Sequence, residues 1–233
     1  LSPAVSRHPR PPAVAGMFYP GDAAVLARDV DAALAAARPD EGHAPKALIV
    51  PHAGYVYSGP IAASAYACLS PLRDGIRRVV LLGPCHRVAV RGLALPAADA
   101  FDTPLGRVPV DRDAVASLAG MAQVVISGAA HAEEHALEVQ LPFLQRTLRE
   151  FAIVPLAVGA ATAGEVAEVL DRLWGGPETL ILISSDLSHY HRYDDAARID
   201  RATADAILAL DPALDHEQAC GATPIAGLLL CAA

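Results

Sequence analysis

The sequence predicts an α/β fold, with a mostly parallel central sheet covered by helices on both faces. Short apolar runs rich in β-branched residues recur along the chain, and segments with helical periodicity separate them. This alternation is typical of strand–helix–strand units, in which the strands lie parallel and both faces of the sheet are buried. No linker rich in proline, glycine or serine divides the 233 residues, so we expect one domain over residues 1–233.

Five apolar runs predict strands, and two shorter runs predict two more. Pro51 ends the first strand because proline has no N–H for a sheet ladder, and Gly83 with Pro84 ends the second. The turn-rich residues 100–106 predict a hairpin. The expected strands cover residues 47–50, 79–82, 93–95, 108–110, 124–126, 153–158 and 179–184.

The helices are expected to begin at residues whose side chains can cap them. Asp22, Ser58, Asp111 and Thr162 are of this kind, and His131 opens a longer helix. The predicted helices cover residues 22–37, 59–69, 111–119, 131–148, 162–174, 194–210 and 223–233, with a short helical turn at 215–220.

Composition disfavours several classes of function. No apolar run reaches the length of a membrane span. The net charge of −8 and the lack of a basic stripe argue against nucleic-acid binding, and no P-loop or G-x-G-x-x-G motif indicates a nucleotide. The four cysteines lie far apart without a C-x-x-C pair, which is typical of cytosolic thiols, so we expect a cytoplasmic protein.

Polar side chains follow three of the predicted strands. His52 follows the first, Cys85 and His86 follow the second, and Asp186 and His189 follow the last. The carboxyl ends of parallel strands meet at one edge of a sheet, where α/β proteins bind their ligands. Histidine together with carboxylate or thiolate is the ligand inventory of transition metals, so the pattern indicates a metal site at that edge.

Three further patterns leave alternatives open. Cys220 precedes a glycine turn, and the residues alone favour a buried structural thiol over a metal ligand or redox group. His131 to His135 matches the H-x-x-E-H pattern of inverted zinc peptidases, a match that is common by chance. The spacing of His135 and Glu138 puts both on one helix face, which suits either the support of a metal ligand from behind or acid–base chemistry. Asp186 is also a candidate helix cap.

The set Asp186, Ser188 and His189 could be interpreted as part of a Ser/His/Asp hydrolase. That interpretation is disfavoured because the sequence lacks the G-x-S-x-G nucleophile elbow.

Six motifs occur in order over nearly the whole chain, at residues 11–20, 50–59, 82–86, 134–143, 184–190 and 219–225. Together they resemble the Memo family, which in bacteria is called AmmeMemoRadiSam system protein B. That family is similar in fold to the class III extradiol (LigB-type) dioxygenases, which use non-haem Fe(II). The resemblance also implies a further segment beyond Ala233 and, from the system's name, a radical-SAM partner.

The resemblance implies a metal site formed by His52, His86 and Cys220, which raises Cys220 from structural thiol to ligand. His135, Asp186 and His189 match the remaining pocket positions and are the expected catalytic residues, whereas His131 has no role there. The fold likeness favours iron, while a thiolate ligand is softer and favours copper or zinc.

The expected function is a metal-dependent, dioxygenase-like oxidoreductase acting on a small molecule. One alternative is a non-catalytic module that binds a phosphopeptide in the same cleft, with Arg87 and Arg192 at its rim. Another is a copper-binding redox or chaperone protein.

Overall fold

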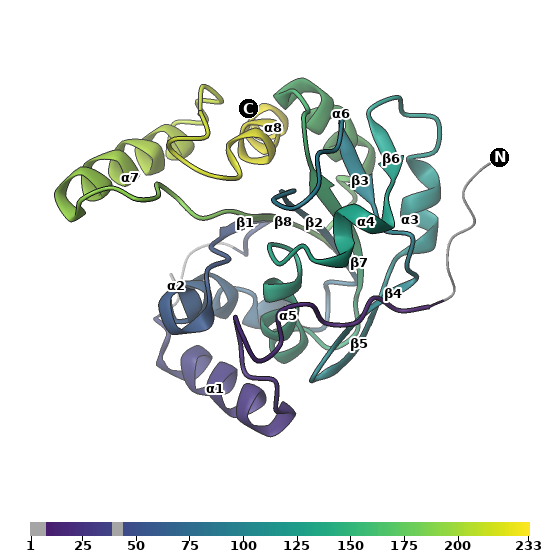
Figure 1. Ribbon diagram of the computed structural model, residues 1–233, viewed down its shortest axis with the longest axis vertical. Coiled ribbons are helices and arrows are strands. Elements are labelled where there is room, and N and C mark those ends of the chain that lie inside the picture. The colour runs from purple at the N-terminus through teal and green to yellow at the C-terminus, as the bar shows by residue number, and fades with distance from the viewer. Residues whose placement is uncertain (1–7, 39–43) are drawn as a thin grey trace.

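A six-stranded sheet runs through the computed structural model, which describes residues 8–38 and 44–233 (Figure 1). Its strands are β1 (Ala47–Val50), β2 (Arg78–Pro84), β3 (Leu93–Leu95), β6 (Val124–Ile126), β7 (Ala152–Val158) and β8 (Thr179–Ser184). They lie in the order β1-β8-β2-β7-β3-β6. The strands β1, β8, β2 and β7 are parallel, whereas β3 pairs antiparallel with β7 and parallel with β6. The predicted α/β fold with a mostly parallel sheet is confirmed.

The strands β4 (Ala100–Thr103) and β5 (Gly106–Pro109) form a separate antiparallel hairpin, as predicted. Gly106 has φ +117°, a backbone conformation that favours glycine and allows the tight turn between the two strands.

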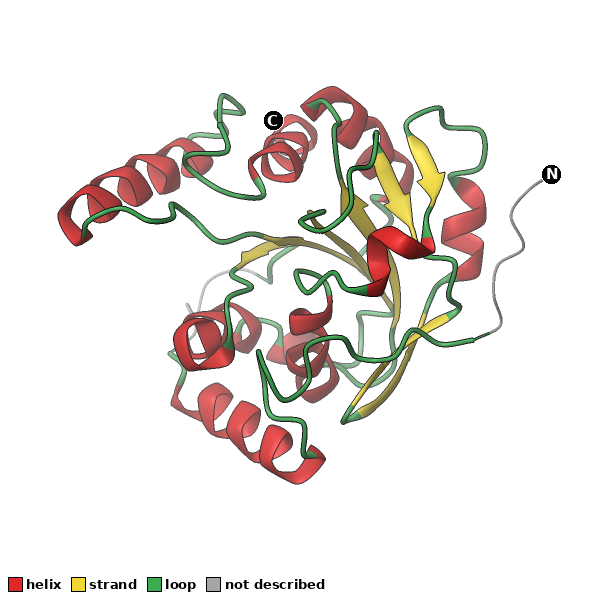
Figure 2. Cartoon of the chain, viewed as in Figure 1, coloured by secondary structure: helices red, strands yellow, loops and turns green. Residues whose placement is uncertain are grey.

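Helices cover both faces of the sheet, and Figure 2 shows the strands between two groups of helices. One face carries α1 (Ala23–Ala36), α2 (Tyr55–Ala67) and α5 (Leu141–Thr147). The other carries α6 (Ala163–Leu173) and α8 (Ala222–Ala232).

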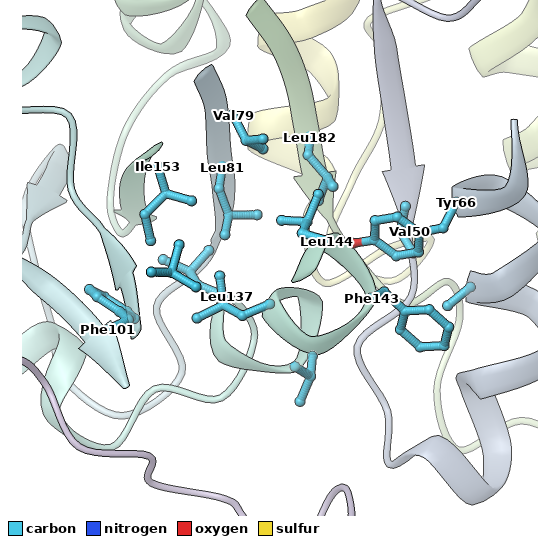
Figure 3. Close-up of a cluster of buried hydrophobic side chains, with 14 of the residues drawn as sticks. Val50, Tyr66, Val79, Leu81, Phe101, Leu137, Phe143, Leu144, Ile153 and Leu182 are labelled. Carbon is cyan, nitrogen blue, oxygen red and sulfur yellow. The ribbon is translucent and has the colours of Figure 1, made fainter. Parts of the chain in front are cut away.

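The inner strands therefore contribute to two hydrophobic cores. Val79 and Leu81 of β2 face the core shared with α2 and α5, and Val80 and Leu82 face the core shared with α6 and α8. Figure 3 shows the first core, where Leu81 and Leu182 of the sheet lie near Leu144. This double burial explains why the strands are continuous apolar runs in the sequence.

Three of the four predicted helix caps are confirmed. Asp22 and Asp111 accept the backbone N–H groups of the residues three positions on, and Thr162 forms a full capping box with Glu165. The cap at Ser58 is wrong, because α2 already begins at Tyr55 and the Ser58 hydroxyl instead donates to the carbonyl of Ala53. The loop after His52 is thus shorter than expected.

The long helix predicted over 131–148 is also wrong. The segment divides into α4 (Gly128–Ala132), an irregular turn, the 3-10 helix η2 (Glu138–Gln140) and α5. The carboxylate of Glu134 accepts the backbone N–H of Ala136, and Pro142 has no N–H for helix continuation. As a result, His131 and His135 do not share a helix face.

The remaining helices are α3 (Arg112–Ser117), α7 (Tyr193–Leu208) and the 3-10 helix η1 (Ser70–Leu72). Figure 1 shows α7 extending away from the body of the fold, and Thr203 is its buried residue. The predicted short turn forms where the N–H groups of Gln218 and Ala219 donate to the carbonyl of Asp215. Within the described ranges, every helix is too short or too polar to cross a bilayer.

Candidate metal centre

Two histidines and one cysteine meet at the carboxyl edge of the sheet. His52 lies two residues after β1 and His86 two residues after β2, while Cys220 directly precedes the turn into α8. One ligand atom from each of the three side chains lies within 4.8 Å of the other two. The Sγ atom of Cys220 is 3.3 Å from Nε2 of His52. The structure thus brings together the three residues expected to bind a metal.

His52 is buried and is held on both its backbone and its ring. Its backbone N–H donates to Oδ1 of Asp186 over 2.7 Å, and its Nδ1 lies 3.0 Å from Oγ of Ser184. Because Nδ1 is occupied by Ser184, the atom that faces Cys220 is Nε2.

His86 is held by Glu134, whose carboxylate accepts from the backbone N–H over 2.5 Å and lies 2.9 Å from Nδ1. Burial alone would raise the pKa of Glu134, but hydrogen bonds from His86 and from the backbone of Ala136 lower it to about 2. Hydrogen bonds to Cys220 and Glu134 raise the pKa of His86 to about 9, against the effect of burial. No separate role for Glu134 was predicted from the sequence, although this residue begins one of the six motifs.

The thiol of Cys220 ionises more readily than an ordinary cysteine thiol. Burial opposes ionisation, but hydrogen bonding with His52 and His86 lowers the pKa of the thiol to about 6. The thiolate, which is the metal-binding form, therefore predominates at pH 7. This setting favours a ligand over the buried structural thiol that the residues alone suggested.

The loop around Cys220 is fixed by a close approach to β8. The N–H of Gly221 donates to Oγ of Ser185 over 2.9 Å. A Cβ at position 221 would lie only 2.6 Å from Cβ of Ser185, so only glycine fits without a shift of the backbone.

His135 lies beside the ligands. Its ring centroid is 5.3 Å from that of His52 and 4.7 Å from those of His86 and Phe18. Its Nδ1 is buried without a hydrogen-bond partner among the described residues, 3.4 Å from a Glu134 oxygen. Burial, together with positive charge on the neighbouring histidines, lowers the pKa of His135 to about 4, so the imidazole is neutral at pH 7.

Asp186 and His189 complete the cluster. Oδ1 of Asp186 accepts from the backbone N–H groups of His52 and Ala53, so Asp186 orients the His52 loop and does not cap a helix of its own. Its Oδ2 lies 3.8 Å from Nε2 of His52 and 3.9 Å from Nε2 of His189. The His189 side chain is 41% exposed and therefore lies at the rim.

Three residues singled out by the sequence bond to groups outside this cluster. Nε2 of His131 is 2.8 Å from the carbonyl oxygen of Ala94, so His131 does not join His135 in a metal site, and the zinc-peptidase interpretation is wrong. Glu138 forms a buried ion pair with Arg10, at 2.6 Å. It is not the acid–base partner of His135 that its spacing suggested. The thiol of Cys85 donates to the carbonyl of Val88.

The fold and the site together define an α/β protein with a candidate transition-metal centre at the carboxyl edge of its sheet. Comparison with known sequences gives the family. Residues 10–230 match the family described as Memo-like protein.

Curated relatives named MEMO1 family protein cover most of the chain. The Aquifex aeolicus protein is 39% identical over 207 residues, which are 87% of this chain and 75% of that protein. The Ignicoccus hospitalis protein is 36% identical over 222 residues, with 87% and 76% coverage, and the Thermotoga maritima protein is 35% identical over 231 residues, with 89% and 80% coverage. The chain belongs to the Memo family.

Proposed function

We propose that the chain binds one transition-metal ion through His52, His86 and Cys220 and uses it in an oxidoreductase reaction on a small molecule. The observation that supports this most directly is the convergence of one ligand atom from each side chain within 4.8 Å. The residues fit the group, because imidazole nitrogen and thiolate sulfur are ligands of zinc, copper and iron. Three protein ligands leave positions open for substrate.

Iron is the proposed metal, with copper and zinc as the alternatives. The likeness of the family's fold to Fe(II) dioxygenases favours iron, and the Cys220 thiolate favours the softer metals. When bound, the ion supplies a Lewis acid or redox centre with open positions.

Three neighbouring side chains handle protons and orientation in this proposal. His135 is neutral at pH 7 because its pKa is lowered to about 4, so its ring accepts a hydrogen bond or a proton from a substrate. Asp186 orients His52 through the backbone and presents Oδ2 toward His52 and His189. His189, at the rim, contacts the substrate as it enters.

The thiolate itself supports a second candidate, a Cu(I)-binding redox or transfer protein. Thiolate is a soft ligand that Cu(I) prefers, and it is readily oxidised during repeated turnover with O₂. In that case the metal would be handed over in stoichiometric amounts without turnover. Binding of a phosphopeptide near the exposed Arg87 and Arg192, a radical-SAM partner and a cytoplasmic location stay predictions.

The test is the metal content of anaerobically purified, untagged protein, measured by mass spectrometry. We expect near-stoichiometric metal in the wild type and its loss in His52→Ala and Cys220→Ser. Cys231→Ser is the matched control, because Cys231 is a partly buried thiol of α8 that donates to the carbonyl of Ala167. A wild type without metal, or a Cys220→Ser protein with full occupancy, would contradict the proposal.

A further inference from the structure

A buried chain of polar side chains lies behind His52. Nδ1 of His52 is 3.0 Å from Oγ of Ser184, which is 2.8 Å from Nε2 of Gln140, and Oε1 of Gln140 accepts from the Tyr66 hydroxyl over 2.7 Å. All four residues are at most 2% exposed. A polar chain this deep in the core must satisfy each donor and acceptor internally.

The direction of each hydrogen bond follows from groups that can only accept. The carbonyl of Ala136, 2.6 Å from Oγ of Ser184, takes the single hydroxyl hydrogen. The carbonyl of Pro51, 2.9 Å from Nε2 of Gln140, requires the nitrogen of that amide at this position. The second amide hydrogen of Gln140 then points to Ser184, so the Ser184 oxygen acts as an acceptor toward both Gln140 and His52.

We infer that Ser184 and Gln140 are positioning residues that hold a proton on Nδ1 of His52 and thereby leave Nε2 as its metal-binding atom. An unprotonated Nδ1 would place two lone pairs opposite each other across 3.0 Å between two buried side chains. The consequence for metal binding rests on the proposed function. The Nδ1 proton itself is a property of the metal-free protein.

The other ligand histidine shows the same arrangement with a different acceptor. Nδ1 of His86 faces the carboxylate of Glu134 at 2.9 Å, which also requires a proton on Nδ1. Histidines that bind metals commonly donate their second ring N–H in this way, which fixes the ring orientation and the tautomer. His52 thus differs from His86 in having a neutral hydroxyl, and not a carboxylate, behind it.

The test combines nuclear magnetic resonance with zinc affinity. In metal-free protein labelled with ¹⁵N-histidine, we expect a slowly exchanging Nδ1–H signal of His52, identified by its absence in His52→Ala. Ser184→Ala should lose the slow exchange and bind Zn²⁺ about 10–100-fold more weakly in chelator competition. Tyr66→Phe, which leaves Ser184 and Gln140 in place, should keep the signal.

Thr203→Val is the matched control, because it removes a buried hydroxyl that donates to the Ile199 carbonyl within α7. It should change neither the signal nor the Zn²⁺ affinity. A wild type with the His52 proton on Nε2 alone, or a folded Ser184→Ala protein with unchanged signal and affinity, overturns the inference. The wild-type signal decides the tautomer even if Ser184→Ala does not fold. A wild type that shows the signal but binds no Zn²⁺ refutes the proposed function and leaves the tautomer assignment intact.

Discussion

Single residues set the geometry of the candidate centre, and Gly221 shows this most sharply. In Gly221→Ala, the new Cβ would lie 2.6 Å from Cβ and 2.7 Å from Oγ of Ser185, so the backbone must move and carry Cys220 with it. We expect loss of bound metal and a destabilisation of about 1–3 kcal/mol, measured by metal analysis and urea unfolding.

Gly59→Ala is the control for that prediction. Gly59 lies inside α2, where the nearest atom to a new Cβ is the Cβ of Tyr55 at 3.6 Å, an ordinary contact. Inside a helix, alanine is more stable than glycine by about 0.5–1 kcal/mol. This variant should therefore be at least as stable as the wild type and keep its metal. Full metal occupancy in Gly221→Ala would show that the close approach does not position Cys220.

His131 makes stability depend on pH. Burial lowers its pKa in the folded protein to about 4, from the usual histidine value of 6.5. The unfolded chain therefore takes up the proton first, and the stabilisation present above pH 6.5 is lost as the pH falls toward 4. Between pH 7 and pH 5 the wild type should lose about 2 kcal/mol of unfolding free energy through this group.

The measurement is urea unfolding at pH 7 and pH 5 for the wild type and His131→Gln. The glutamine amide can place a donor near the Ala94 carbonyl but does not titrate. The difference in stability between the two pH values should be about 2 kcal/mol smaller in the variant. Equal pH dependence in both proteins would refute a neutral, buried His131.

At the scale of elements, the turn that carries Glu134 and His135 depends on the N-terminal arm, residues 10–20. Glu138 accepts from the Arg10 guanidinium and the Tyr19 hydroxyl, each over 2.6 Å, and from the backbone of Ala13 and Val14. The Arg10 guanidinium also donates to the carbonyl of Glu134 over 2.7 Å. The arm and the turn are therefore one hydrogen-bonded unit.

Breaking this ion pair should be costly. Arg10 is 5% and Glu138 0% exposed, so Glu138→Ala leaves a buried charge without its partner and should destabilise the fold by about 3–5 kcal/mol in chemical unfolding. Asp31→Ala removes the partner of Arg146 in an exposed pair of similar length and should cost about 0–1 kcal/mol. Similar losses in both variants would contradict the role given to the buried pair.

The sequence predicted the elements best where the signal is local. The apolar strand runs and the caps at Asp22, Asp111 and Thr162 depend on near neighbours, and they are confirmed. The break in the predicted helix over 131–148 has a local cause that the prediction did not use, the missing N–H of Pro142. Its other cause is tertiary, because Glu134 is held by His86, from a distant strand end. The antiparallel direction of β3 likewise has no local signal.

At the scale of the whole molecule, strand order assembles the site. β8 lies between β1 and β2, and Ser184 pairs in register with Val50, two residues before His52. Histidines at equivalent positions after strands were visible in the sequence, and so was the edge they share. The supporting roles of Ser184, Glu134 and Gln140 were not, because they arise only when non-sequential strands become neighbours.

The central claim is that His52, His86 and Cys220 bind one metal ion together, and X-ray absorption of the zinc-loaded protein tests it most directly. The account predicts one sulfur ligand at about 2.3 Å and nitrogen ligands at about 2.0–2.1 Å, with the sulfur absent in Cys220→Ser and retained in Cys231→Ser. A wild-type spectrum without sulfur, or a Cys220→Ser spectrum that keeps it, would contradict the assignment.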